Sequence, residues 1–224
     1  MKIELIITGL TDMKDSYRCI SGYDIANKRY LRPLLKNSRI DSNFVNQASK
    51  EIKIFNKVTF EVDSFFNNPT APHLEDFYVK YNLISSEDVF NENDIRSFLE
   101  KIADNNIKDV YGEYIEFYKD HYVIPEGVGK RSLGTIICRD VRVYEDGKGK
   151  TRVDYTDKTG YELKNIPCVA HDKQYKKKGR YKNIALRLGL SRLYDPWSEK
   201  TGDNEAFYWP QVSAVFSEWE ISNE

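Results

Sequence analysis

Alternating apolar and polar positions run through most of the chain and predict a mainly β protein. Val58, Phe60 and Val62 share one face of residues 57–66, which is the spacing of a half-buried strand. The same pattern predicts strands at 2–9, 16–24, 28–35, 57–66 and 72–82, and again at 114–119, 133–146, 150–157, 161–170, 182–196 and 207–221.

One segment between these two sets has the period of a helix instead. Ile95, Phe98, Leu99 and Ile102 follow the helical spacing, and they predict a helix over about 92–104 with Asn91 as one candidate cap. Glycine-bearing turns between the strands favour hairpins. We therefore expect two small antiparallel barrels of the OB type: residues 1–83 form the first, 84–126 a helical and acidic linker, and 127–224 the second.

Composition supports a folded chain and leaves few special sites. The 224 residues are 40% apolar, which is enough for a core, and no apolar run is long enough for a signal peptide or a membrane span. We expect a soluble, cytoplasmic protein without a membrane partner. Three widely spaced cysteines indicate neither a disulfide framework nor a zinc site, and they are expected to be buried in strands.

The net charge of −1 conceals a strong division along the chain. Residues 127–192 carry a net charge of +10, whereas 84–126 carry −7 and 193–224 carry −6. A basic third of a nearly neutral protein suggests a surface that attracts a polyanion.

The stretch KQYKKKGRYK at 173–182 is the densest part of this basic region. Six of its ten residues are cationic and two are tyrosines, the combination with which proteins bind single strands through backbone contacts and base stacking. The alternative is a solvated loop. The candidate nucleic-acid contacts in this region are Arg139, Arg142, Lys150, Arg152, Tyr175, Lys176, Lys177, Lys178, Arg180, Tyr181 and Lys182.

Several stretches resemble a known family. LIITGLTDMKDSYRCISGYDIANKRYLRPL, with Cys19, Gly22 and the run Leu31-Arg32-Pro33, is similar to the opening of the bacterial and archaeal dual OB-fold domain family. PHLED at 72–76 is similar to that family's histidine and acidic pair, although Leu74 stands where glutamine is commoner. SLGTIICRDVRVY, LGLSRLYDPW and WPQVSAVF resemble its second barrel.

This resemblance implies two adjacent barrels that bind nucleic acid, often in host defence systems. Arg32 occupies a family-like position from which it would contact phosphate, and a salt bridge at the strand end is the alternative. His73, Glu75 and Asp76 could bind a metal or act as acid and base. We favour a structural turn, because no second histidine lies at ligand spacing.

Enzyme motifs are weak or missing. Asp140 followed by Glu162-Leu163-Lys164 imitates a nuclease core, but acidic-x-Lys occurs about as often as chance allows, and no phosphate-binding or nucleophile motif occurs. We therefore expect no catalytic residues, no metal and no cofactor. The favoured function is non-catalytic binding of single-stranded DNA or RNA, with a protein effector as a further partner. The alternatives are an adaptor that docks on an acidic partner and, third, a metal-dependent nuclease.

Overall fold

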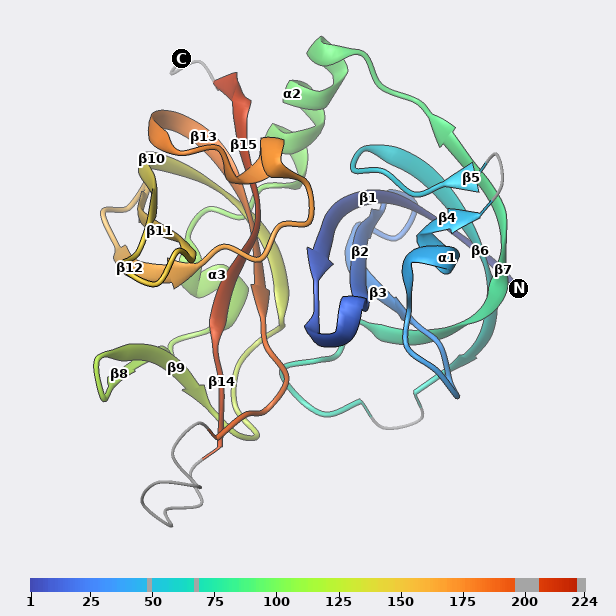
Figure 1. Cartoon of the computed structure of the whole chain (residues 1–224), viewed down its shortest axis with the longest axis horizontal. Coiled ribbons are helices and arrows are strands. Elements are labelled where there is room, and N and C mark those ends of the chain that lie inside the picture. Colours follow the sequence, from blue (N-terminus) through green and yellow to red (C-terminus); the bar gives the residue numbers. More distant parts are fainter. Residues whose placement is uncertain (48–49, 67–68, 196–205, 221–224) are drawn as a thin grey trace.

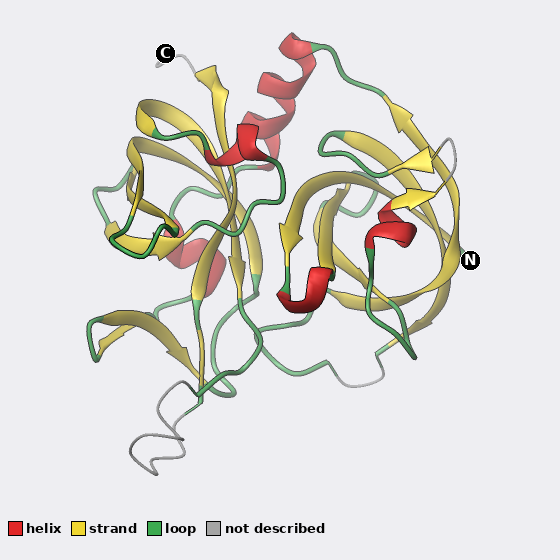
Figure 2. Ribbon diagram, viewed as in Figure 1, coloured by secondary structure: helices red, strands yellow, loops and turns green. Residues whose placement is uncertain are grey.

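The computed structural model describes residues 1–47, 50–66, 69–195 and 206–220. Strands dominate it, so the predicted mainly β class is confirmed. Figures 1 and 2 show two β units side by side, with helix α2 (Glu92–Ile102) at the top between them. We name the first unit the N-terminal barrel (residues 2–88) and the second the C-terminal sheet (strands between residues 133 and 220).

The N-terminal barrel is a closed ring of five strands: β1 (Lys2–Asp12), β2 (Arg18–Asp24), β3 (Arg29–Leu34), β6 (Asn56–Phe65) and β7 (Asp76–Asp88). Its order is β1-β2-β3-β7-β6, and β6 pairs with β1 to close it. The expectation of a wholly antiparallel barrel is wrong here, because β3 and β7 are parallel. A closed ring with an odd number of strands must contain at least one parallel pair.

Short elements fill the connections of the barrel. A 3-10 turn, η1 (Lys14–Ser16), joins β1 to β2, while α1 (Ser42–Val45), β4 (Asn46–Gln47) and β5 (Lys50–Glu51) lie between β3 and β6. The Asp41 carboxylate accepts the Phe44 amide at 2.9 Å and so caps α1. Phe44 and Val45 are buried, which packs this segment against the barrel.

The predicted linking helix is confirmed as α2. Asn91 caps it, with its side chain accepting the Asp94 amide while the Asp94 carboxylate accepts the Asn91 amide. All four of its periodic apolar residues are buried. A second helix that the pattern did not predict, α3 (Ile107–Tyr111), follows it and ends at Gly112, whose φ is +84°.

The C-terminal sheet has the same strand order as the barrel. It contains β10 (Leu133–Glu145), β11 (Thr151–Asp157), β12 (Glu162–Pro167), β13 (Gly179–Leu190) and β15 (Pro210–Glu220), in the order β12-β11-β10-β13-β15. A 3-10 turn, η2 (Lys173–Lys176), precedes β13. The expected second closed barrel is instead an open sheet. In its described residues, the seam between β12 and β15 has a single parallel bridge, Cys168 with Val212, beyond the end of β12.

A small extra sheet flanks the C-terminal sheet. Strands β8 (Glu116–Tyr118) and β9 (His121–Pro125) form a hairpin, and β14 (Phe207–Tyr208) pairs with β9. In Figure 1 the hairpin lies below β11 and β12.

The two units share one apolar core and a buried polar contact. The Phe55 and Phe216 rings, one from each unit, lie 5.1 Å apart between centroids. Arg187 of β13 is fully buried and its guanidinium donates to Thr8 Oγ1 of the barrel at 2.9 Å and to the Gly134 carbonyl at 2.6 Å. The units therefore pack as one body.

The observed strands and helices can be compared with the expected domain boundaries. Residue 83, the expected end of the first unit, lies inside β7, which runs on to Asp88. Residues 84–126 contain α2, α3 and the β8–β9 hairpin. In the described part of the chain, no helix has the length and apolar character needed to cross a membrane.

Candidate functional site

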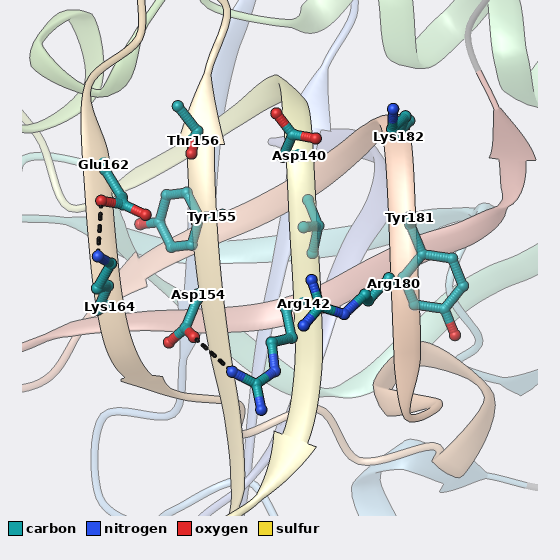
Figure 3. A pocket seen from close by; sticks show the side chains of 11 residues that line it. Asp140, Arg142, Asp154, Tyr155, Thr156, Glu162, Lys164, Arg180, Tyr181 and Lys182 are labelled. Carbon is teal, nitrogen blue, oxygen red and sulfur yellow. Dashed lines mark ion pairs between the residues drawn. The ribbon is translucent and has the colours of Figure 1, made fainter.

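The outer face of the C-terminal sheet contains an open trough of about 410 Å³. Its lining side chains come from the neighbouring strands β12, β11, β10 and β13 (Figure 3). They are Asp140, Val141, Arg142, Asp154, Tyr155, Thr156, Glu162, Lys164, Arg180, Tyr181 and Lys182.

Strand alternation explains why charged side chains gather here. On β10, Val141 and Val143 are buried in the core, whereas Asp140 and Arg142 are exposed on the opposite face. Strand register then arranges the outward residues in two rows across the sheet, Lys182–Asp140–Thr156–Glu162 and Arg180–Arg142–Asp154.

Two arginines stand directly opposite each other in the second row. Arg142 on β10 pairs in register with Arg180 on β13, and both are exposed. Figure 3 shows Arg180 extending from β13 towards Arg142. Like charges opposite each other across two strands destabilise a sheet, and a bound anion would relieve the repulsion. The ion pair that crosses this row, between Arg142 and Asp154, is long at 3.9 Å.

The carboxylates of the trough have partners of their own. Asp154 accepts the Tyr144 hydroxyl at 3.1 Å and the Asn165 amide at 2.8 Å, and Glu162 pairs with Lys164 at 3.0 Å. Thr156 stands between Asp140 and Glu162 in their row. In the part of the chain that the structure describes, no three acidic, histidine or cysteine side chains could hold a metal ion together.

The basic stretch 173–182 divides into engaged and exposed residues. Lys176 donates to the Ala170 carbonyl at 2.7 Å, and Lys178 forms an ion pair with Glu145 at 2.7 Å. Lys177, Arg180 and Lys182 are exposed. Residues 179–183 also form a sheet edge in the described chain, because the pairing of β13 with β15 begins at Ile184.

The two tyrosines of this stretch differ: Tyr175 does not fit the predicted stacking role, and Tyr181 lines the trough. Tyr175 is 7% exposed and packs edge-on against Phe55 and Phe216, so it belongs to the core. Tyr181 is half-buried, and its hydroxyl donates to the Lys177 carbonyl at 2.9 Å. The interpretation of Tyr175 as a base-stacking residue is corrected, because the turn η2 directs it inward.

The hairpin between β10 and β11 is organised by Asp146. Its carboxylate accepts the amides of Lys148 and Lys150, each at 2.9 Å, and pairs with Arg152 at 2.9 Å. The amide of Lys150, followed by Arg152, lowers the pKa of Asp146 to about 2. Lys150 is exposed at the tip, whereas Arg152 is engaged. Arg139 is exposed and pairs with Asp140 at 2.9 Å.

Arg32 is a buried residue and not part of the trough. It is 4% exposed at the junction of the two units, where it donates to Asp76 at 2.6 Å, to Ser132 Oγ at 3.1 Å and to His73 Nδ1. The prediction that Arg32 contacts phosphate is wrong, because its guanidinium is buried and bonded to protein atoms. Arg32 instead forms the salt bridge that was the alternative prediction, with Asp76 as its partner.

The residues around Arg32 form a buried structural cluster. The Glu75 carboxylate accepts the Ser132 and Leu133 amides at 2.8 and 3.0 Å, which fixes the start of β10. His73 Nε2 donates to the Ser191 carbonyl at 3.0 Å, leaving Nδ1 to accept from Arg32. Burial, followed by the charges of Arg32 and Arg192, lowers the pKa of His73 to about 3.

Two exposed aromatic rings lie at the β8–β9 hairpin, outside the predicted contact residues. Phe117, on β8, is 65% exposed and Tyr114, just before it, is 53% exposed. Both residues lie in the strand predicted over 114–119, and neither belongs to the predicted contact residues. The sequence feature that could have drawn attention to these two rings is the aromatic-rich run YIEFY within the acidic segment 84–126.

Comparison with known families gives one result. A family model described as the Dual OB-containing domain matches residues 3–215. Neither the comparison with curated proteins nor that with solved structures found a match.

Proposed function

We propose that this chain, which belongs to the Dual OB-containing domain family, binds nucleic acid on the outer face of its C-terminal sheet. OB folds commonly bind oligonucleotides on a sheet face and its adjoining loops. A fold alone does not establish a function, so the proposal depends on the residues of this face. The observation that carries it is the pair Arg142 and Arg180, two exposed guanidinium groups opposed across β10 and β13.

The surroundings of this pair favour a chain of phosphates over a single anion. Lys182 and Lys177 continue the cations along the N-terminal part of β13 and the turn before it, and Lys150 lies exposed on the β10–β11 turn. Guanidinium groups can bind phosphate oxygens in pairs, and lysines contribute point charges along a backbone. The contact set that we propose is therefore Arg142, Lys150, Lys177, Arg180 and Lys182, with Arg139 and Lys178 at its margin.

We propose binding without catalysis. The carboxylates that imitate a nuclease core are held by Arg139 and Lys164, and Thr156 separates them in the sheet. Cleavage of a labelled oligonucleotide in the presence of Mg²⁺ would contradict this part of the proposal.

The test is the salt dependence of oligonucleotide binding in a double variant, Arg142→Gln with Arg180→Gln. Each phosphate contact releases counterions, so log affinity against log salt has a slope of about −0.7 per contact on single strands. Losing both contacts should make the slope shallower by about 1.4. Fluorescence anisotropy of a labelled oligonucleotide across a salt series measures it.

A matched control removes the same charge elsewhere. Arg96 and Lys101 lie exposed on α2, so Arg96→Gln with Lys101→Gln lowers the net charge equally and should leave the slope unchanged. If the salt slope becomes shallower by the same amount in both double variants, the change is due to net charge and not to contacts at Arg142 and Arg180. If the wild-type chain binds no oligonucleotide at low salt, the proposal is wrong and an adaptor for an acidic partner becomes the better hypothesis.

A further inference from the structure

The β8–β9 hairpin is an appendage with exposed rings. Its cross-strand pair Phe117 and Tyr122 has ring centroids 5.1 Å apart in an edge-to-face arrangement, and Phe117 leaves 65% of its surface in solvent. The other face of the hairpin is supported, because Tyr118 packs on Phe207 at 5.3 Å and His121 on Trp209 at 5.1 Å. Phe117 is thus presented on a braced element.

This hairpin stands beside the β12 side of the trough. Strand β9 contacts β12, and Lys164 of β12 lines the trough. Partial burial, and after it the charge of Arg152 on β11, lowers the pKa of His121 at the hairpin turn. In Figure 1 the hairpin lies below β11 and β12.

The two sides of the trough therefore differ in chemistry. Arg180 and Lys182 lie on β13, about 14 Å from β12 at ordinary strand spacing. The hairpin carries two exposed carboxylates, Glu116 and Asp120, against one exposed cation, Lys119, so its net charge repels phosphate. A ligand that satisfies both sides needs an anionic backbone for β13 and flat, uncharged faces for the hairpin.

We infer that Phe117 on the β8–β9 hairpin stacks the unpaired bases of a single strand whose phosphates lie on Arg142 and Arg180. This inference rests on the proposed function and assigns its ligand class. Stacking on an aromatic ring requires an accessible base face, which a duplex hides inside its own stack. A strand that crosses from β13 to the hairpin fits within the roughly 4–16 nucleotides that one OB fold occupies.

The test compares Phe117→Ala with wild type on three labelled probes of equal length. They are an oligo(dT) of about 15 nucleotides, an abasic strand with the same phosphates, and a duplex. Losing one stacked base should weaken oligo(dT) binding about five- to 150-fold, with an unchanged salt slope. Affinity for the abasic strand and for the duplex should stay as in wild type.

Phe65→Ala is the matched control, because Phe65 is an exposed phenylalanine, 42% accessible, on β6 of the N-terminal barrel. It should bind oligo(dT) as wild type does. If Phe117→Ala also binds normally while Arg142→Gln with Arg180→Gln has lost affinity, the stacking inference is wrong and the proposed function stands. If neither variant changes binding, both are wrong.

A second measurement avoids any effect of Phe117→Ala on folding. Bromouracil-substituted DNA cross-linked to the wild-type protein by ultraviolet light should label the tryptic peptide 109–119, which contains Tyr114 and Phe117. Cross-links confined to other peptides would overturn the inference. Binding of a lysine-rich peptide in place of DNA, lost in Phe117→Ala, would assign the hairpin to a basic protein partner and would overturn it as well.

Discussion

In the N-terminal barrel, β3 and β7 are joined by three successive parallel pairs, whereas the equivalent seam between β12 and β15 has the single bridge Cys168–Val212 in the described chain. Both units otherwise follow one strand order. The charged residues at the closed seam, Arg32 and Asp76, are buried in the junction with the other unit. In the C-terminal sheet, the opposed arginines face solvent.

This difference separates two uses of arginine within one molecule. Arg32 and Arg187 are almost completely buried and direct their donors to protein acceptors, so their energetic role is cohesion between the units. Arg142 and Arg180 lie on an exposed face, where their like charges repel each other. Removing a cation should therefore affect stability in one set and ligand affinity in the other.

The largest effect is expected for Asp76→Asn. Asp76 pairs with Arg32 at 2.6 Å and with Arg192 at 2.7 Å, and it is 7% exposed. Its loss leaves the buried Arg32 guanidinium without its carboxylate, which typically costs about 3–5 kcal/mol. Urea unfolding measures the change. The oligonucleotide affinity of the folded variant should match wild type.

Glu61→Gln is the matched comparison within the same barrel. It breaks the ion pair of Lys80 and Glu61, also 2.6 Å long but largely exposed, and stability should barely change. A similarly small effect of Asp76→Asn would contradict the cohesive role of the buried cluster.

Most of the strand framework could be predicted from sequence because burial of one sheet face imposes alternation. The β8–β9 hairpin was missed for a local reason. Its turn residues, Lys119 and Asp120, both have positive φ, at 45° and 64°, without the asparagine or glycine that usually marks such a turn. The single strand expected over 114–119 therefore did not reveal β9 or the exposed rings.

Part of the candidate site could be predicted from the sequence, because some of its residues depend only on strand alternation. Basic composition located Arg142 and Arg180, because exposed cations on adjacent strands require only alternation and register. It could not exclude Arg32 or Tyr175, since their burial depends on the partner unit and on the turn η2. Arg187 carried a usable signal, as a lone cation within the apolar run IALRLGL.

An intermediate effect is expected when the pH is lowered. His73 is buried among Arg32, Arg192 and Asp76, with the Tyr208 ring against it, and its pKa is lowered to about 3. An unfolded histidine titrates near 6.5, so the unfolded state binds the extra proton first. The contribution of His73 is complete above pH 6.5 and is lost as the pH falls towards 3, by about 1.4 kcal/mol at pH 5.5.

His73→Gln isolates this contribution, because an amide can still donate to the Ser191 carbonyl and accept from Arg32. The stability difference between wild type and variant, from urea unfolding at pH 7.5 and 5.5, should shift in favour of the variant on acidification. A constant difference would show that folding does not lower the pKa of His73. Oligonucleotide affinity at neutral pH should remain within about threefold of wild type, less than 1 kcal/mol.

The smallest effect, and the one that most sharpens the comparison, is a gain of stability in Arg180→Gln. Removing one of two like charges that oppose each other across β10 and β13 relieves a repulsion of about 0.2–1 kcal/mol. The variant should therefore unfold at equal or slightly higher urea concentration than wild type while binding oligonucleotide more weakly. Raising the salt concentration should shrink the stability gain, because salt screens the repulsion in the wild-type protein. A loss of stability in Arg180→Gln would place Arg180 with Arg32 among the cohesive arginines and remove the main support for a phosphate site on this face.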